Sequence, residues 1–487
     1  MTAKEQAGEA PRMIQRTIGN IGRAWKDLTG ATRVRLTGSV RPDLPEIDLK
    51  RLARQIDECL LGRGGAVSER ARAADLGHTY SGLNAVGRRR FLELLARDYG
   101  VDAKAVSAAA SAWLALVPSG AGCPGDRVAR CQAVQSDLRA ALTPPRVQLL
   151  SRFTTLPNGV KFLVDMRAEL IPLARADPQL KGLDGDMKRL FASWFDVGFL
   201  ELRGITWDAP ASLLEKLAEY EAVHAIESWS DIKNRLAPDR RCYAFFHPQM
   251  PGEPLIYLWV ALVRGLAANV QELLDVSAPT GNPYEADTAI FYSISNAQAG
   301  LTGISFGSFL IKRVVEDLTR DFKNLKVFAT LSPVPEFIAW LNEQIAEYGA
   351  ELLRPSELRK LSTLSPDPTG IDLLTVIQQQ DGLFSKETIQ EAIRAPLLRM
   401  CAQYLTGAKR GQYARDRVAH FHLSNGARIE RINWLADTSP NGMRQSFGMM
   451  INYLYESRDI EDNHEAYSGD GRIRASKSVK ALLKDKG

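Results

Sequence analysis

The stretch that decides the fold covers residues 286–335, which read ADTAIFYSISNAQAGLTGISFG (286–307), SFLIKRVVEDLTRDF (308–322) and, three residues later, KVFATLSPVP (326–335). The first segment is rich in β-branched and aromatic residues and runs into a glycine-rich turn, which predicts a buried strand. The second segment predicts an amphipathic helix, because its apolar residues recur at helical spacing. The third predicts another strand. The apolar helix positions are Ile311, Val314, Val315, Leu318 and Phe322.

Three glycines of this stretch, Gly300, Gly303 and Gly307, lie at or near the N-terminus of the predicted helix. Exposed N–H groups and the positive end of the helix dipole attract an anion there, and glycine lets a phosphate approach the backbone closely. The stretch lacks both GxxxxGKS/T and GxGxxG, which argues against a P-loop and a dinucleotide loop. The glycines therefore predict either a pyrophosphate site or simply a strand-to-helix turn.

Residues 298–303 have the form Q-x-G-x-x-G, which resembles the pyrophosphate loop of GNAT-type acetyltransferases, a fold that binds coenzyme A. Further segments resemble the malonyl-CoA decarboxylase family, and they occur in order between about residues 191 and 455. These segments are RRCY (240–243), PGEPL (251–255), FYSIS (291–295), GSFLIKRVV (307–315), LSPVP (331–335), FHLSNGA (421–427) and RINWLAD (431–437).

The resemblance implies an α+β chain, in which an N-terminal all-α helical bundle domain precedes a GNAT-type acetyltransferase-like α/β catalytic domain with a mixed sheet. We place a flexible arm at residues 1–40, the helical domain at 41–190 and the catalytic domain at 191–487. The resemblance also implies conversion of malonyl-CoA to acetyl-CoA and carbon dioxide. It further implies a homo-oligomer, a tetramer, with the helical domain as the oligomerisation element.

Helical patterns without strand patterns fill the first part of the chain, and proline or glycine interrupts nearly every interval between them. No fixed-period repeat is present. The expected helices cover residues 49–60, 84–99, 102–116, 127–142, 145–153, 160–174 and 184–194.

Strand patterns open the second part of the chain. The runs RCYAFFH (241–247) and LIYLWVALV (255–263) flank a proline-glycine turn and predict an antiparallel hairpin. Residues 420–423 alternate up to Asn425-Gly426, a strong hairpin signal, so residues 427–434 are expected to return as a strand. Helices are expected at residues 211–220, 336–348, 372–379, 386–405 and 445–458.

Composition limits the possible partners and location. The 62 basic and 57 acidic residues leave a net charge of only +5, which gives little support to a nucleic-acid binder. Five cysteines are scattered without a CxxC pair, which favours a reducing compartment. No run approaches the roughly 20 apolar residues of a membrane span. We therefore expect a cytoplasmic protein that binds neither nucleic acid nor membrane.

His422 is the candidate for proton transfer, because imidazole titrates near neutral pH. Malonyl-CoA carries its own electron sink in the thioester carbonyl, so no cofactor or metal is expected. The protein has to orient the breaking bond, stabilise the enolate and protonate carbon. From the residues alone, a core histidine in a strand is the favoured interpretation of His422, and His420 shares its face of the predicted strand. The resemblance assigns the catalytic role to His422.

Ser332 and Tyr455 complete the candidate catalytic set. Ser332 precedes Pro333, so it could simply be the N-cap of a helix with proline at the first position. The resemblance instead pairs Ser332 with His422 at the malonyl group, as proton acceptor and donor respectively. Tyr455 matches the family's functional tyrosine, although an aromatic residue at helical spacing from Ile451 could be a core residue.

The candidate substrate-binding residues follow the glycine loop. At position 305, animal members of the family carry an acidic residue counted among the catalytic groups, whereas this chain has a serine, which cannot act as a carboxylate base. Two other functions stay open: an acyl-CoA-dependent acyltransferase and a non-catalytic acyl-CoA sensor. Besides Ser332 and His422, the binding residues are Gln298, Gly300, Thr302, Gly303, Ile304, Ser305, Phe306, Gly307 and Ser308.

Overall fold

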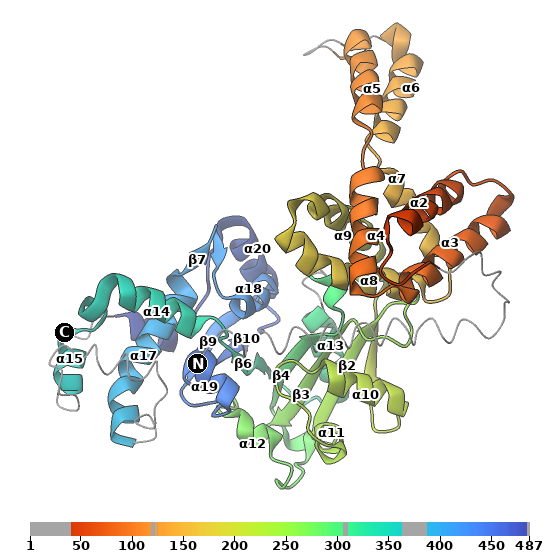
Figure 1. Cartoon of the computed structure of the whole chain (residues 1–487). Coiled ribbons are helices and arrows are strands. Elements are labelled where there is room, and N and C mark those ends of the chain that lie inside the picture. The colour runs from red at the N-terminus through yellow and green to blue at the C-terminus, as the bar shows by residue number, and fades with distance from the viewer. Residues whose placement is uncertain (1–39, 118–121, 124, 305–309, 363–386, 485–487) are drawn as a thin grey trace. The chain divides into compact units, whose positions relative to one another are not determined.

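The computed structural model describes residues 40–117, 122–123, 125–304, 310–362 and 387–484 (Figure 1). The chain forms two compact units. The first runs up to Phe199 and also takes in the short segments His247–Pro251 and Gln298–Ser305, and the second takes in the rest. The predicted arm at residues 1–40 lies outside the described residues except for its last residue. The predicted helix at 372–379 lies entirely outside them.

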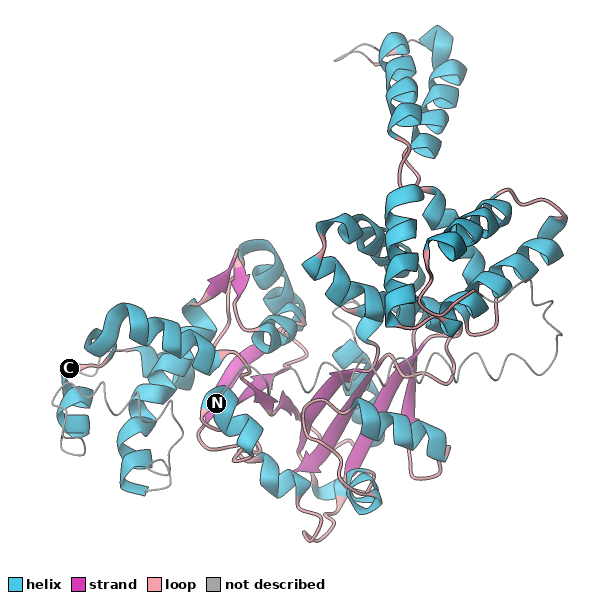
Figure 2. Cartoon of the chain, in the orientation of Figure 1, coloured by secondary structure: helices cyan, strands magenta, loops and turns pink. Residues whose placement is uncertain are grey.

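The first unit is built from helices (Figure 2). The seven helices predicted there are confirmed, with ends that differ by a few residues. Side-chain caps fix some of them: Asn84 accepts from the Gly87 N–H, and Asp102 accepts from the Lys104 and Ala105 N–H groups. One helix was missed, α3. The helices are α2 (Glu46–Leu60), α3 (Gly65–Gly82), α4 (Ala85–Asp98), α5 (Ala103–Leu116), α6 (Val128–Ala141), α7 (Pro145–Phe153), α8 (Gly159–Ala176) and α9 (Lys181–Trp194).

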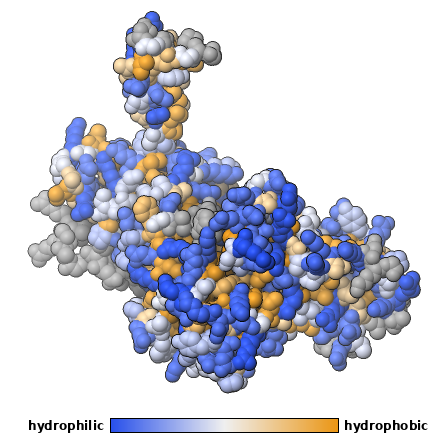
Figure 3. All heavy atoms as spheres, turned by 180° about the vertical axis from the view of Figure 1, so that it is seen from behind, coloured by the Kyte–Doolittle hydropathy of each residue, from blue (hydrophilic) through white to orange (hydrophobic). Residues whose placement is uncertain are grey.

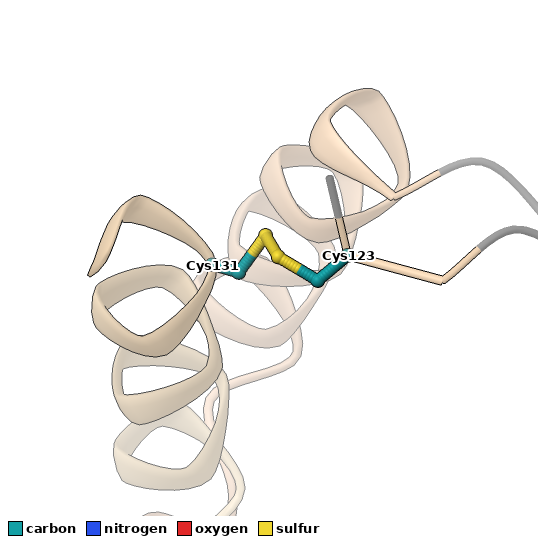
Figure 4. The surroundings of a disulfide bond; sticks show 2 residues. All are labelled: Cys123 and Cys131. Atoms are coloured by element: carbon teal, nitrogen blue, oxygen red, sulfur yellow. A yellow bond between two sulfur atoms is a disulfide. The ribbon is translucent and has the colours of Figure 1, made fainter. Parts of the chain in front are cut away.

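Helices α5 and α6 pack side by side as a hairpin with a small core of its own. That core contains Leu116, Val117 and Cys131. A disulfide joins Cys131 of α6 to Cys123 in the connection between the helices (Figure 4). The scattered cysteine spacing did not predict this bond, and a disulfide is unusual in the reducing compartment that the sequence favoured.

The second unit is organised around one mixed sheet of eight strands among the described residues, in the order β1-β2-β3-β4-β5-β10-β6, with β9 on β10. The predicted β2–β3 hairpin is confirmed as antiparallel, and β4 pairs with β5 in parallel through the crossover helix α13 (Leu310–Asp321). The strands are β1 (Glu201–Ile205), β2 (Arg240–Phe246), β3 (Ile256–Val263), β4 (Thr288–Asn296), β5 (Val327–Thr330), β6 (Ser332–Pro333), β9 (Arg428–Asn433) and β10 (Met450–Leu454). A separate small sheet pairs β7 (Lys409–Arg410) with β8 (Tyr413–Ala414).

Helices cover both faces of this sheet. Leu214, Leu217 and Ile232 of α10 and α11 pack on one face. On the other face, Arg313 of α13 lies over the ring of Phe245 of β2. The predicted order of strand, loop, helix and strand is confirmed by β4, α13 and β5, which follow one another in the chain. The predicted fold class is also confirmed. The helices are α10 (Ala211–Tyr220), α11 (Trp229–Arg235), α12 (Val270–Leu274), α13 (Leu310–Asp321), α14 (Phe337–Tyr348), α15 (Pro355–Ser362), α17 (Glu387–Gly407), α18 (Arg417–Ser424), α19 (Pro440–Ser446), α20 (Ile460–Asp470) and α21 (Lys477–Leu483).

Strands β4 and β5 separate before β4 ends. Their registered pairs stop at Phe291 and Thr330, whereas β4 continues to Asn296. Beyond that point β5 gives way to the short strand β6, which pairs with β10 instead. Ser332 therefore lies where the parallel pair opens.

Two predictions near the C-terminus are wrong. Residues 420–423 belong to helix α18 and not to a strand, because Asp416 caps the helix and Gly426, with φ of +81°, ends it. The predicted helix at 445–458 is instead the end of α19 followed by β10, with Phe447 and Gly448 at positive φ in the turn between them. The expected returning strand is confirmed as β9.

Within the described residues, no helix combines the length and the apolar character needed to cross a membrane. On the face drawn in Figure 3, most of the coloured surface is hydrophilic, and hydrophobic residues form local patches within it.

Candidate active site

Ser332 is the first residue of β6, and it pairs with Ile451 of the antiparallel strand β10. The side chain is buried, and its Oγ lies 2.9 Å from Nε2 of His422. The interpretation of Ser332 as a helix N-cap is wrong, because the following helix, α14, begins only at Phe337. Ser332 therefore has a side-chain partner, the imidazole, and no helix to cap.

His422 lies in the last turn of α18, which buries Ala419, His422 and Leu423 at helical spacing. Since residues two apart on a helix point in different directions, His420 does not share its face, contrary to the expectation from a strand. His420 is exposed, and its Nδ1 lies 2.8 Å from the hydroxyl of Tyr467. The two histidines therefore have different partners: His422 contacts Ser332 and Tyr455, whereas His420 contacts Tyr467.

Tyr455 directly follows β10, and its backbone N–H donates to the carbonyl of Phe328 in the neighbouring β5. Its hydroxyl lies 2.8 Å from Nδ1 of His422. Ser332, His422 and Tyr455 thus form one continuous chain of hydrogen bonds, with the imidazole in the middle.

A fourth residue, Tyr453, was not predicted. It lies in β10, two residues before Tyr455, and both tyrosine rings contact the imidazole of His422. Its ring stacks on the imidazole of His422 with a centroid distance of 4.5 Å and an interplanar angle of 25°. The alternation of MINYL (450–454) could have revealed this tyrosine had the segment been interpreted as a strand.

Burial sets the protonation of this group of residues. His422 is buried, and desolvation lowers its pKa to about 3, so the imidazole is neutral near pH 7. Desolvation also raises the pKa of Tyr455 well above its ordinary value, so its phenol stays protonated. The site therefore offers neutral hydrogen-bonding groups that can donate and accept protons.

Asn452 of β10 links its strand to neighbouring segments of the second unit through side-chain hydrogen bonds. Its Nδ2 donates to the carbonyls of Thr330 (2.7 Å) and Ala267 (3.1 Å). Its Oδ1 accepts from Arg431 Nε (3.0 Å) and from Asn433 Nδ2 (2.9 Å). All four hydrogen-bonding positions of this buried amide are filled, which fixes β10 against the end of β5. Sequence reasoning did not identify this residue, because its partners come from distant segments.

The glycine loop belongs to the other compact unit. Gln298 and Gly300 are buried, and a 3₁₀ turn (Ala299–Leu301) begins the loop. Thr302 is exposed and donates from Oγ1 to the carbonyl of Ala299, while Gly303 has φ of +76°, a conformation that favours glycine.

The rest of the predicted binding set continues from there. Ile304 is buried, and its N–H donates to Leu301. Ser305, Phe306, Gly307 and Ser308 lie outside the described residues.

The comparisons with known proteins agree with this architecture. A family model described as the malonyl-CoA decarboxylase C-terminal domain matches residues 198–487, and one described as the N-terminal domain matches residues 99–195. A curated relative from Anser anser anser, "Malonyl-CoA decarboxylase, mitochondrial", is 40% identical over 424 residues, which are 85% of this chain and 83% of the relative. The Rattus norvegicus protein of the same name is 37% identical over 424 residues, 85% of each chain.

Solved structures give the same result. A crystal structure of malonyl-CoA decarboxylase from Rhodopseudomonas palustris matches with a TM-score of 0.79 and 39% identity, covering 89% of this chain and 99% of that one. The enzyme from Agrobacterium vitis matches with a TM-score of 0.76 and 39% identity, covering 89% and 100%. The chain belongs to the malonyl-CoA decarboxylase family.

Proposed function

We propose that this protein is a carboxy-lyase that converts malonyl-CoA to acetyl-CoA and carbon dioxide. The observation that carries the proposal is the buried chain of hydrogen bonds from Ser332 through His422 to Tyr455. Family membership supplies the substrate class, and the three residues supply donors and acceptors for the carbon that must be protonated.

The reaction begins when the bond between the carboxylate carbon and the α-carbon breaks. Its electron pair moves onto the α-carbon and the thioester carbonyl, which gives carbon dioxide and an enolate. A proton then forms the new C–H bond, and one proton from water restores the site. An enolate carbon is a strong base, so a neutral hydroxyl or imidazole N–H can supply this proton.

The hydrogen bonds suggest how the proton is held. If the Tyr455 hydroxyl donates to Nδ1 of His422, then Nε2 carries the ring proton and donates to Ser332 Oγ. The hydroxyl proton of Ser332 is then available to the substrate. The immediate donor to carbon is either that hydroxyl or the Nε2–H, and both use the same chain of groups.

The neutral state of His422 suits a decarboxylation. An imidazolium would pair with the malonyl carboxylate and stabilise the starting state, which opposes its loss as carbon dioxide. Because desolvation lowers the pKa of His422 to about 3, no such ion pair is expected near neutral pH. The thioester is the electron sink, so we propose a reaction without metal or organic cofactor.

We also propose a location and an assembly for this protein. The proposed cytoplasmic location rests on the scattered cysteines, while the Cys123–Cys131 disulfide and the word "mitochondrial" in the names of the relatives weigh against it. The proposed homotetramer rests on the family resemblance. Malonyl-CoA is the expected partner, and the modest net charge supports no nucleic-acid partner.

Purified protein incubated with malonyl-CoA alone tests the function. We expect stoichiometric acetyl-CoA and carbon dioxide without any acceptor, and we expect Ser332→Ala to slow this conversion. Product that forms only when an acyl acceptor is added would instead identify an acyltransferase. Binding of malonyl-CoA without turnover would identify a sensor.

A further inference from the structure

The glycine loop rests on helix α8 of the helical unit, and one side chain of that helix holds it. Arg167 Nη1 donates to the carbonyls of Gly300 (2.6 Å) and Thr302 (3.0 Å). The side chain is buried, and its Nε donates to Asp184 of α9 (2.8 Å). Arg167 therefore ties two helices of the first unit to a loop more than 130 positions away in sequence.

The loop also approaches the α8 backbone closely. A Cβ added to Gly300 would lie 1.8 Å from the carbonyl oxygen of Val164, so only glycine fits there. Gln298–Ser305 accordingly groups with the helices of the first unit in the compact division of the chain. From sequence, this loop is expected in the catalytic domain, and the helical domain is expected to mediate oligomerisation.

The bond to Thr302 determines where the next amide points. In a trans peptide the C=O and N–H groups are antiparallel, so the Gly303 N–H points away from Arg167 when the Thr302 carbonyl points toward it. Lys188 of α9 is exposed, and its Nζ lies 3.4 Å from where a Gly303 Cβ would be. An outward N–H beside a lysine is a favourable setting for a phosphate oxygen.

We propose that the helical unit shapes the coenzyme A site: Arg167 is a positioning residue that aims the Gly303 amide at the diphosphate, and Lys188 adds a cation beside it. This inference rests on the proposed function, because it takes coenzyme A as the ligand. It gives the helical unit a part in substrate affinity that is separate from assembly.

Arg88 provides a matched control within the same unit. Like Arg167 it is buried, and it donates to two backbone carbonyls, of Leu83 and Ser81, and to one carboxylate, Glu169. Within the described residues, Arg88 makes no hydrogen bond with the glycine loop. Arg167→Met and Arg88→Met therefore remove equivalent interactions, and only the first should alter the loop.

The experiment compares full-length wild type, Arg167→Met and Arg88→Met by calorimetry with coenzyme A. We expect Arg167→Met to weaken binding about 10- to 100-fold, since misplacing a binding group by about 1 Å can cost that much. Arg88→Met should bind like wild type. Equal affinity of wild type and Arg167→Met, or equal losses in both variants, would overturn the inference.

Kinetics with two substrates separate the diphosphate from the reacting group. Arg167→Met should raise KM for malonyl-CoA about as much as it weakens binding, but leave kcat/KM unchanged for malonyl-pantetheine, which lacks the diphosphate. Equal losses with both substrates would assign Arg167 a merely structural role.

If Arg167→Met does not fold, the exposed Lys188→Ala decides the question. It should weaken coenzyme A binding several-fold, and unchanged affinity would contradict the site. Wild-type protein that binds no coenzyme A would refute the proposed function itself, which is a different result from an unaffected variant.

Discussion

His422 is the residue whose loss should most directly stop the reaction. If it delivers or relays the proton, His422→Ala should lower the decarboxylation rate by roughly 10²- to 10⁴-fold, with coenzyme A affinity nearly unchanged. His420→Ala is the control, because His420 lies on the same helix but bonds Tyr467 instead. Single-turnover rates and calorimetry measure the two effects.

Ser332 should behave as part of the same unit. Ser332→Ala should slow turnover in the same class as His422→Ala, and the double variant should be little worse than either single one. A His420→Ala variant as damaged as His422→Ala, beside an active Ser332→Ala, would refute the residue assignment and leave the fold unaffected.

The buried imidazole of His422 also makes stability depend on pH. Its pKa is about 3 in the folded protein and near 6.5 when unfolded, so between these values only the unfolded chain binds this proton. Stability from His422 is therefore fully present above about pH 6.5 and is lost as pH falls toward 3.

His422→Asn should remove this contribution. Between about pH 4 and 6 its free energy of unfolding should change less steeply than that of wild type, by up to about 1.4 kcal/mol per pH unit. Urea titrations at several pH values measure the slopes. Parallel slopes would mean that the folded imidazole is already protonated, and the neutral-imidazole mechanism would then fail.

For single residues, the sequence alone indicated which residue types could act in the site, but not which side chains contact one another. Ser332, His422 and Tyr455 were predicted only through the family resemblance, since the residues alone favoured a structural interpretation of each at least as much. Tyr453 and Asn452 were missed because stacking and amide networks join residues far apart in sequence. No local pattern records such contacts.

Among the elements, α18 shows that one local sequence signal, here Asn425-Gly426, is compatible with two different structures. Asn-Gly favours a tight hairpin turn, but glycine in the left-handed region is also the commonest helix end. Here a Cβ on Gly426 would lie 2.2 Å from the carbonyl oxygen of Ile460, so α20 packs against the turn and favours the helical alternative. Strongly periodic elements such as α13 and β3 were predicted correctly, because their own apolar pattern decides them.

The glycine loop supports a prediction at the element scale. Gly303→Asp should weaken coenzyme A binding far more than it slows turnover of bound substrate, because it adds a carboxylate where phosphate meets the backbone. Gly265→Asp is the matched control: Gly265 also has positive φ, +71°, and no atom near its Cβ position. Calorimetry with coenzyme A compares the two variants. Similar affinity in both would contradict a phosphate-binding loop.

For the whole molecule, sequence reasoning placed the change from helices to strands near residue 190, and the compact units divide at Phe199. It could not place the glycine loop with the helical unit. That grouping depends on Arg167 and on the close approach of Gly300 to Val164, both contacts between distant segments. Composition and periodicity depend on residues that are neighbours in sequence, so they cannot predict that the glycine loop groups with the helical unit.

The helical unit also exposes apolar side chains that a second copy could cover. Leu114 of α5 is 54% exposed and Leu142 beyond α6 is 53% exposed. Within the described residues, α5 buries only Leu116. Self-association through the helical unit is a prediction that rests on the family resemblance, and these two exposed leucines are the positions at which we test it.

We therefore expect wild-type protein to have a mass near four times the 53.8 kDa of one chain in light scattering. Leu114→Glu combined with Leu142→Glu should lower that mass, because two carboxylates would have to be desolvated in the interface. Val276→Glu is the control, as Val276 is 59% exposed but belongs to the other unit. A wild-type mass of one chain would refute the oligomer, and an unchanged mass in the double variant would place the interface away from the α5–α6 hairpin.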